Sequence, residues 1–339
     1  MIKIAVDAMG GDHAPQAIVE GALAAVQTYS DIQILLYGDQ DQIQALLPEG
    51  DYPIEIVHCS EKIAGDDEPV RAIRRKKDAS MVVAAKAVKK GQAHALVSAG
   101  NTGALLAAGT LLVGRIKGID RPALLGTLPN LRESGESFVL VDMGANADAK
   151  AKQLWENALM GNQYAKDVLG KSQPRVGLLN NGSEDTKGNK VTKEAFELLS
   201  QEEQIHFIGN VESRDILAGA CDVVVSDGFT GNAVLKAIEG TAKEILTLVS
   251  HSLKSGNLKT KLGALLIKNS LKETLGQFDI ESVGGATLFG VKAPVIKCHG
   301  NASAKTVAAT IGQARQIVKS GTYDSLAQQI TNKEIQAED

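Results

Sequence analysis

The chain has 339 residues, enough for one large α/β unit or for two lobes that each bury a core. Its 36 basic and 40 acidic residues give a formal net charge of -4, which excludes the broad positive field of a nucleic-acid-binding protein. Three cysteines at unrelated spacings, Cys59, Cys221 and Cys298, form neither a disulfide framework nor a zinc pattern, so we expect a cytoplasmic protein that holds no metal.

The N-terminal sequence begins as a strand rather than as a leader. Its apolar run Ile2–Val6 meets Asp7 too soon for the apolar region of a secretory signal. The longest apolar stretch, residues 104–113, is shorter than the roughly 18 residues that a membrane helix needs. We therefore expect no leader and no membrane-spanning segment.

Short β-branched and apolar runs alternate with longer amphipathic patterns along the chain. This alternation predicts an α/β protein with a mainly parallel sheet and helices on its faces. No Pro-rich or Ser-rich linker divides the chain, so any two-lobe arrangement within residues 1–339 requires the chain to cross between the lobes. The predicted strands are Ile2–Val6, Ile32–Tyr37, Ile54–His58, Ala93–Val97, Phe138–Val141, Val176–Leu179, Ile205–Ile208, Asp222–Val225 and Val295–Lys297.

Ligands of a doubly wound sheet bind beyond the carboxyl ends of its strands, so the loops there are the places to look for chemistry. The loop after the first strand contains Gly10 and Gly11, which suit either close approach to a ligand or a plain strand-to-helix turn. The loop after the fourth strand precedes an apolar helix. Its small residues suit a phosphate or an oxyanion, and they are Ser98, Gly100, Asn101, Thr102 and Gly103.

Two later loops have a similar composition. Residues 177–189 include Asn180 and Lys187 but lack the spacing of a nucleoside triphosphatase loop, so Lys187 is either a phosphate ligand or a solvated lysine. The loop after Asp222–Val225 again places small donors at a helix start. Its residues are Asp227, Gly228, Thr230, Gly231 and Asn232, and two such loops favour phosphate binding more than one does.

The last loop, residues 298–303, holds Cys298, His299 and Asn301. Neighbours on an extended strand point to opposite faces, so Cys298 and His299 are not expected to form a nucleophile and its base. His299 is either a donor to an anion or carbonyl oxygen, or a packed or helix-capping residue. The dinucleotide, serine-hydrolase and zinc-protease motifs are absent from the sequence, which disfavours those three classes.

Taken in order, these loops resemble those of the PlsX phosphate acyltransferases. The matching segments lie between Ile2 and about Tyr323 and read DAMGGDHAP, PVRAIRRKKDASM, SAGNTGA, GIDRPAL, VDMGAN, NNGSEDTKGN, SDGFTGN and CHGNAS. The resemblance implies transfer of a fatty acyl group from acyl carrier protein to inorganic phosphate, feeding acyl phosphate to a membrane glycerol-3-phosphate acyltransferase in bacterial phospholipid synthesis. It also implies a homodimer without a cofactor, and a three-layer α/β/α fold similar to those of phosphotransacetylases and isocitrate and isopropylmalate dehydrogenases.

Such a reaction depends on positioning and charge, because phosphate is largely a dianion near neutral pH and a thiolate leaves readily. We expect the two glycine-polar loops and Lys187 to hold phosphate, and His299, Asn232 or Asn101 to donate to the oxyanion. Asp7 and Asp142 are expected to orient their neighbours. The predicted catalytic residues are Lys187, Asn232 and His299, and the predicted substrate-binding residues are Gly10, Gly11, Ser98, Gly100, Asn101, Thr102, Gly103, Asn180, Asp227, Gly228, Thr230, Gly231 and Asn301.

A basic segment lies between His251 and Lys272, where the chain has five lysines and no acidic residue. On a helix, its leucines and isoleucines fall on two sides with a lysine stripe between them. We expect a helical segment over residues 236–278 and peripheral membrane contact through residues 251–275, or alternatively a dimer interface with a solvated lysine edge. A second cluster, Arg71 to Lys77, suits either the charges of helix ends or the docking of a carrier protein.

Two other functions fit parts of the pattern. A decarboxylating dehydrogenase on a similar fold would need a nicotinamide site and carboxylates around a divalent metal, and neither is visible as a motif. A catalytically silent scaffold on a membrane surface would use the basic segment but would have no need of glycine-polar loops at strand ends.

Overall fold

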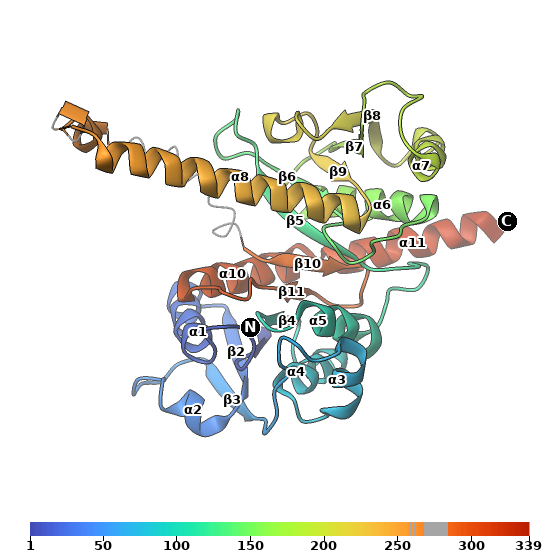
Figure 1. Ribbon diagram of the computed structural model, residues 1–339. Helices are drawn as coiled ribbons and strands as arrows, with labels where there is room; N and C mark the ends of the chain where they lie inside the picture. The colour runs from blue at the N-terminus through green and yellow to red at the C-terminus, as the bar shows by residue number, and fades with distance from the viewer. Residues whose placement is uncertain (258, 261, 268–283, 339) are drawn as a thin grey trace.

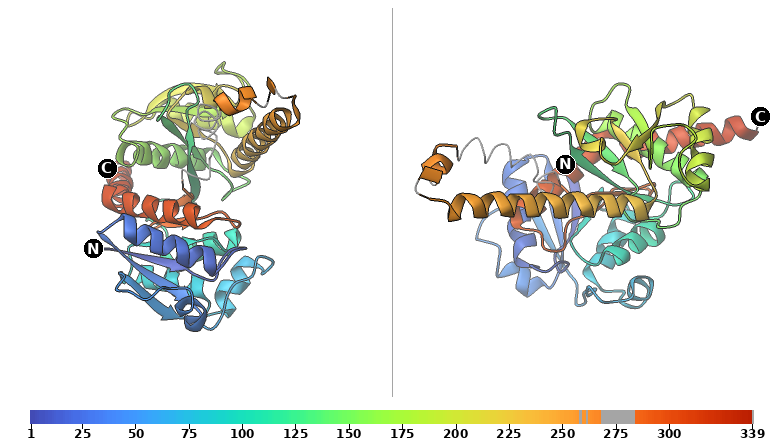
Figure 2. Two further views of the ribbon diagram at one scale, coloured as in Figure 1. Left: turned by 90° about the vertical axis from the view of Figure 1, so that its left-hand side faces the viewer. Right: turned by 45° about the horizontal axis from the view of Figure 1, so that its top comes forward.

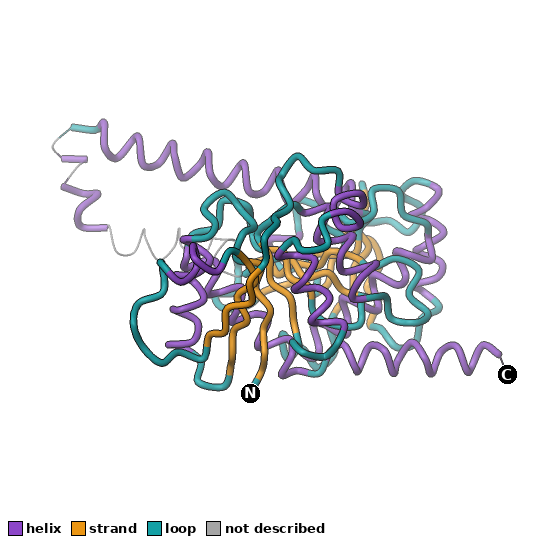
Figure 3. The backbone as a smooth tube through the Cα atoms, turned by 90° about the horizontal axis from the view of Figure 1, so that it is seen from below, coloured by secondary structure: helices purple, strands orange, loops and turns teal. Residues whose placement is uncertain are grey.

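The computed structural model describes residues 1–257, 259, 260, 262–267 and 284–338. These residues form an eleven-stranded sheet of order β3-β2-β1-β4-β11-β10-β5-β6-β9-β7-β8, with helices on both of its sides (Figures 1 and 3). The strands are β1 (Ile2–Asp7), β2 (Ile32–Gly38), β3 (Ile54–His58), β4 (Ala95–Ser98), β5 (Ala123–Pro129), β6 (Ser137–Val141), β7 (Arg175–Asn180), β8 (His206–Glu212), β9 (Val223–Val225), β10 (Ala286–Phe289) and β11 (Val295–Lys297).

The first half of the molecule is built on β1 to β4, which are parallel to one another. On one side of these strands α1 (Gln16–Thr28) packs against α10 (Ala304–Ser320), and a side chain at Gly21 would lie 2.6 Å from Val307, so only glycine allows this close approach. The helices on the other side and at the strand ends are α2 (Gln40–Gln44), α3 (Pro69–Arg75), α4 (Ser80–Lys89), α5 (Thr102–Ala108) and the π-helical turn η1 (Gly109–Val113).

The second half contains β6, β9, β7 and β8, which are again parallel to one another. The helix α8 (Gly228–Ser255) begins at the end of β9 and projects far beyond the sheet, as Figure 1 and the right-hand view of Figure 2 show. The remaining elements of this half are α6 (Ala151–Asp167), α7 (Lys190–Ser200) and the 3₁₀ turn η2 (Ile216–Ala218), and the C-terminal helix α11 (Thr322–Glu338) packs against α6.

Three strands join the two halves in the middle of the sheet. β11 lies parallel to β4, whereas β10 is antiparallel to both β11 and β5, and β5 is antiparallel to β6. The chain therefore crosses from the first half to the second after α5 and returns through β10, β11 and α10. Buried apolar residues form two core clusters. The larger one runs through both halves, and the smaller one lies between residues 124 and 224.

The predicted α/β class with a mainly parallel sheet is confirmed. All nine predicted strands are present, two with the predicted bounds (Ile54–His58 and Val295–Lys297) and seven with shifted ends. The prediction was wrong in omitting β5 and β10. Both are antiparallel central strands, and β5 contains Gly126 and ends at Pro129, residues that usually mark loops. The predicted strand Ile205–Ile208 continues to Glu212, because Gly209 adopts a φ of 93° and carries the strand past an irregularity.

Candidate functional site

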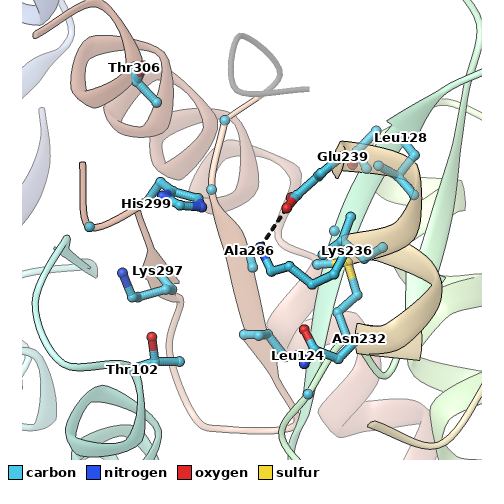
Figure 4. Close-up of a pocket in the computed structure, with 18 residues that line it drawn as sticks. Thr102, Leu124, Leu128, Asn232, Lys236, Glu239, Ala286, Lys297, His299 and Thr306 are labelled. Atoms are coloured by element: carbon cyan, nitrogen blue, oxygen red, sulfur yellow. Dashed lines mark hydrogen bonds and ion pairs between the residues drawn. The ribbon is translucent and has the colours of Figure 1, made fainter. Parts of the chain in front are cut away.

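A cavity of about 480 Å³ lies between the two halves, over the central strands. Residues of β5, β10 and β11 line it, together with the loops that follow β6 and β11 and the first turns of α5 and α8. Figure 4 shows Thr102, Lys297 and His299 on one side of this cavity and Asn232, Lys236 and Glu239 on the other. Three residues predicted from separate loops, Thr102, Asn232 and His299, are thus brought together.

The side formed by the first half is polar and basic. Lys297 is the last residue of β11, is paired in register with Ser98 of β4, and donates from Nζ to the backbone carbonyl oxygens of Ala99 and Cys298. Burial lowers the pKa of the Lys297 ammonium group below its ordinary value. His299 and Thr102 are exposed to the cavity beside it. Cys298, which directly follows β11, is buried, so Cys298 and His299 face different surroundings.

The side formed by the second half combines polar and apolar groups. Asn232 lies at the start of α8, one turn before Lys236, whose Nζ is 2.5 Å from Oε2 of Glu239. Between them and the sheet, four apolar side chains line the cavity: Leu124 and Leu128 of β5, Met143 and Leu235. The cavity therefore offers an apolar wall opposite a basic one.

The β4–α5 loop, residues 99–101, uses most of its polar groups internally. The buried Ser98 hydroxyl, which precedes the loop, donates to Asp7 at 2.6 Å and accepts from the N–H of Gly100 at 3.0 Å. Asp7 also accepts from the Ser80 hydroxyl, and burial raises the pKa of its carboxyl group although these bonds oppose the shift. Asp7 thus orients its neighbours, and the Ser98 hydroxyl is occupied inside the protein.

Asn101 and Gly103 connect the same loop to α3. Oδ1 of Asn101 caps α5 by accepting from the N–H of Ala104, and its Nδ2 lies 3.0 to 3.3 Å from three carbonyl oxygens of residues 64–67. A side chain at Gly103 would lie 2.6 Å from Pro69. These contacts hold the loop in place. Thr102, which lies between Asn101 and Gly103, faces the cavity.

The β9–α8 loop, residues 226–227, is held in a comparable way. Asp227 caps α8 by accepting from the N–H of Thr230 at 2.7 Å. Gly228 and Gly231 are buried against residues 142–146, where a side chain at either position would meet the backbone. That segment is organised by Asp142, which accepts from the backbone N–H groups of Leu124, Gly144, Ala145 and Asn146.

A second hollow of about 420 Å³ lies on the other side of the α8 N-terminus. Asn180, Asp227 and Thr230 line it, so three further predicted residues are close together. Lys187 follows in the adjacent β7–α7 loop, where it is exposed and its Nζ lies 3.9 Å from Oε1 of Glu184. Lys187 lies outside the linings of both hollows.

The remaining predicted residues lie at the edge of the site. Gly10 packs against Gly100, with its Cβ position 2.8 Å from that backbone nitrogen, and Gly11 packs against Ala99 and Gly300 with a φ of 108°. The loop after β1 therefore supports the β4–α5 loop and does not line the cavity. Asn301 is exposed after Gly300, also outside the lining.

Sequence reasoning missed Lys297, Lys236 and the apolar wall. Lys297 was included in the predicted strand Val295–Lys297 without a role, because a lysine at a strand end is ordinarily solvated. The signal that distinguishes it is the register of β11 with β4, which places it beside the β4–α5 loop. The apolar wall depends on β5, which was not predicted.

The predicted basic segment falls partly outside the described residues, which exclude Leu258, Lys261, Lys268, Leu271, Lys272 and Leu275. Within the described part, Leu262, Leu265, Leu266 and Ile267 are exposed. None of the helices that the structure describes is both long enough and apolar enough to cross a membrane.

Known proteins are similar to this chain in both sequence and fold. A model of the fatty acid synthesis protein family matches residues 2–324. A phosphate acyltransferase of Streptococcus uberis is 55% identical over 99% of both chains, and one of Streptococcus suis is 57% identical over 96% of both chains.

Solved structures of phosphotransacylases have a similar fold. A branched-chain phosphotransacylase of Enterococcus faecalis superposes with a TM-score of 0.60 at 18% identity, covering 94% of this chain and 99% of its own. A phosphotransacetylase of Streptococcus pyogenes gives a TM-score of 0.59 at 19% identity, covering 93% of this chain and 94% of its own. These likenesses confirm the predicted fold class. Together with the family match and the close relatives, they lead to one conclusion: the chain belongs to the fatty acid synthesis protein family of PlsX phosphate acyltransferases and is an enzyme of the transferase class.

Proposed function

We propose that this enzyme transfers a fatty acyl group from acyl carrier protein to inorganic phosphate, and that the acyl phosphate product enters phospholipid synthesis. The observation that carries the proposal is the cavity between the two halves. Its apolar wall, Leu124, Leu128, Met143 and Leu235, suits an acyl chain, and its opposite wall, with Thr102, Lys297 and His299, suits an anion. The two halves would act as lobes that hold the two substrates against each other.

The reaction requires a phosphate oxygen to attack the carbonyl carbon of the thioester. A carbon–oxygen bond forms while the carbonyl electron pair moves onto its oxygen, and the return of that pair breaks the carbon–sulfur bond. The thiolate leaves and takes up the proton that the phosphate carried. Asn232 and His299 face each other across the cavity and are the proposed donors to the oxyanion.

The other predicted residues have supporting roles in this proposal. Lys187 stays a predicted catalytic residue that contacts the phosphate, and Asn180, which lines the second hollow, stays a predicted substrate contact. Ser98, Asn101 and Asp227 hold the loops in place through the hydrogen bonds described above.

The position of α3 supports an acidic carrier protein as the acyl donor. Arg71, Arg74 and Arg75 are exposed at helical spacing, while the neighbouring Lys76 is paired with Asp67 at 2.5 Å. Because Pro69 of α3 contacts Gly103, this basic surface lies next to Thr102 at the cavity. A carrier bound there would present its acyl group near the site.

The outer part of α8 supports the proposed homodimer and membrane contact. Only Gly228 and Gly231 of this helix are buried, and Ile245 and Leu248 are 52% and 65% exposed. We propose that a second copy covers this part of α8, and that residues 251–275 contact the cytoplasmic membrane surface, where a membrane glycerol-3-phosphate acyltransferase would receive the product.

Acyl phosphate formation by the purified chain tests the proposal directly. Long-chain acyl carrier protein and inorganic phosphate are incubated with the protein without metal or nicotinamide, and acyl phosphate and free thiol are measured. Thiol release that requires phosphate and equals acyl phosphate formed is the expected result. If the folded protein releases no thiol, the proposal is rejected. Nicotinamide binding would then test the dehydrogenase function, and lipid binding would test the scaffold function.

A further inference from the structure

The most unusual charge in the cavity belongs to Lys297. Its side chain is half-buried at the carboxyl end of β11, in the middle of the sheet, and its Nζ lies 3.3 Å from the carbonyl oxygen of Ala99 in the β4–α5 loop. The ammonium group is thus held at the point where the β4–α5 loop and the loop after β11 meet. Backbone carbonyls fix its position without neutralising its charge.

The other lysines near the cavity differ from Lys297 in their partners. Lys236 is 2.5 Å from Glu239, and Lys187 is within 3.9 Å of Glu184. Among the residues that the structure describes, no carboxylate forms an ion pair with Lys297. The acidic groups that act on its charge are the Cys298 thiol, Asp12 and Asp7. Neither aspartate forms an ion pair with it, and Asp7 already accepts from two hydroxyl groups.

A half-buried cation without an anionic partner is unfavourable in the free protein. Burial accordingly lowers the pKa of Lys297, as noted above. An anion that enters the cavity would remove this cost, and the hydroxyl of Thr102 and the imidazole of His299 line the same wall as further donors. The wall therefore matches a small, doubly charged oxyanion.

We propose that Lys297 binds the inorganic phosphate substrate and supplies the main positive charge against which its oxygens are held. This inference rests on the proposed function, because it assigns the place of one of the two substrates. It places phosphate on the first-half wall and the acyl chain on the apolar second-half wall. The carbonyl carbon then lies between Lys297 and Asn232.

Phosphate binding by variants of the full-length chain tests the inference without turnover. Inorganic phosphate is titrated calorimetrically into the parent protein, Lys297→Met and Lys297→Arg, with Lys292→Met as the matched control on an exposed lysine of the preceding loop. We expect the dissociation constant to rise on the order of 10- to 100-fold in Lys297→Met. The arginine variant should retain most of the affinity, and Lys292→Met should bind as the parent does.

A second uncharged variant covers the case in which Lys297→Met does not fold. Lys297→Gln keeps an N–H donor for the carbonyl oxygens of Ala99 and Cys298 and should lose phosphate affinity to a similar extent. Unchanged phosphate affinity in a folded Lys297→Met or Lys297→Gln protein, or a parent protein that binds no phosphate, would overturn the inference.

Steady-state kinetics separate this inference from the proposed function. Loss of charge at Lys297 should raise the KM for phosphate at least tenfold and leave the KM for the acyl donor within about twofold. Acyl phosphate formation with an unchanged KM for phosphate would keep the function and reject the role of Lys297. If phosphate binding depends on Lys297 but the protein forms no acyl phosphate, the role of Lys297 is kept and the proposed function is rejected.

Discussion

The β4–α5 loop and the β9–α8 loop both join a buried strand to a helix through glycines and small polar residues, but the helices that follow are different. α5 is a short helix packed inside the first half, whereas α8 has 28 residues and leaves the body of the protein. The first turns of the two helices each present an exposed polar side chain to the cavity, Thr102 in α5 and Asn232 in α8. In both loops the other polar groups serve the structure, so a glycine-polar sequence marks the site without identifying which residue touches substrate.

Each loop also rests on a buried carboxylate, and the two carboxylates have different partners. Asp7 accepts from two serine hydroxyls and one backbone N–H, whereas Asp142 accepts from four backbone N–H groups and the Asn146 amide. Hydroxyl groups can turn to donate or accept, but N–H groups can only donate. The β4–α5 loop should therefore tolerate a change at its carboxylate better than the second-half site does.

The largest effect is expected from Asp142→Asn. The new amide group would face N–H donors that now bond to a carboxylate oxygen, which should lower the free energy of unfolding by about 3 kcal/mol. Urea denaturation measures this loss, with Asp148→Asn, an exposed acid in the same segment, as the control. A loss below about 1 kcal/mol would show that the segment under α8 does not depend on this carboxylate.

Asn232→Ala should change activity rather than stability. Removing one donor to the oxyanion should lower kcat about a hundredfold, because about 3 kcal/mol of transition-state stabilisation is lost, while the exposed side chain contributes little to folding. Thr241→Ala, on an exposed face of the same helix, is the control. Equal loss of activity in both variants would assign the effect to the helix and not to Asn232.

Asn101→Ala should show the opposite behaviour. It removes the cap of α5 and the three bonds to residues 64–67, which should lower the free energy of unfolding by about 2 kcal/mol. Asn101→Ser keeps a capping oxygen and should recover about 1 kcal/mol of that loss. If Asn101→Ala lowered kcat about a hundredfold without loss of stability, Asn101 would be a substrate contact.

The smallest effect concerns the pH dependence that Asp7 contributes. Burial raises the pKa of Asp7 in the folded protein above its ordinary value near 4. The folded protein therefore favours the protonated carboxyl group. The stability that Asp7 contributes is fully present below about pH 4 and is lost as pH rises through the folded-state pKa. Asp7→Asn should remove this loss, making the unfolding free energy less dependent on pH above about 4 than in the parent. Denaturation curves between pH 4 and pH 8 provide the measurement, and parallel pH profiles for both proteins would contradict it.

The sequence predicted the fold class and the nine strands whose apolar runs are bounded by loop residues. β5 and β10 were not found this way. They pair with each other although they are more than 150 residues apart in the chain, and the sequence gives no sign of that pairing. Lys297 had no local signal either. Its burial results from the β11–β4 register, so its environment is a product of tertiary structure.

For the candidate site, the sequence located the loops but not the division of roles within them. Thr102, Asn232 and His299 lie around one cavity, as expected of residues at strand ends, whereas Lys187 lies in a neighbouring loop. The segment SAGNTGA does not indicate that residues 64–67 hold Asn101 in place or that Thr102 faces the cavity. That distinction depends on tertiary structure, because residues 64–67 accept from Asn101 and α3 packs against α5.

The place of β10 and β11 also has a consequence for the synthesis of the protein. These strands come late in the chain, yet they join the two halves and form part of the floor of the cavity. Before residues 286–297 have been made, β4 lacks its neighbour β11, and β5 lacks its neighbour β10. Completion of the sheet must therefore wait until residues 286–297 have emerged, and a truncated product would expose two open sheet edges prone to aggregation. The enzyme can thus complete the candidate site only after residues 286–297 have been made.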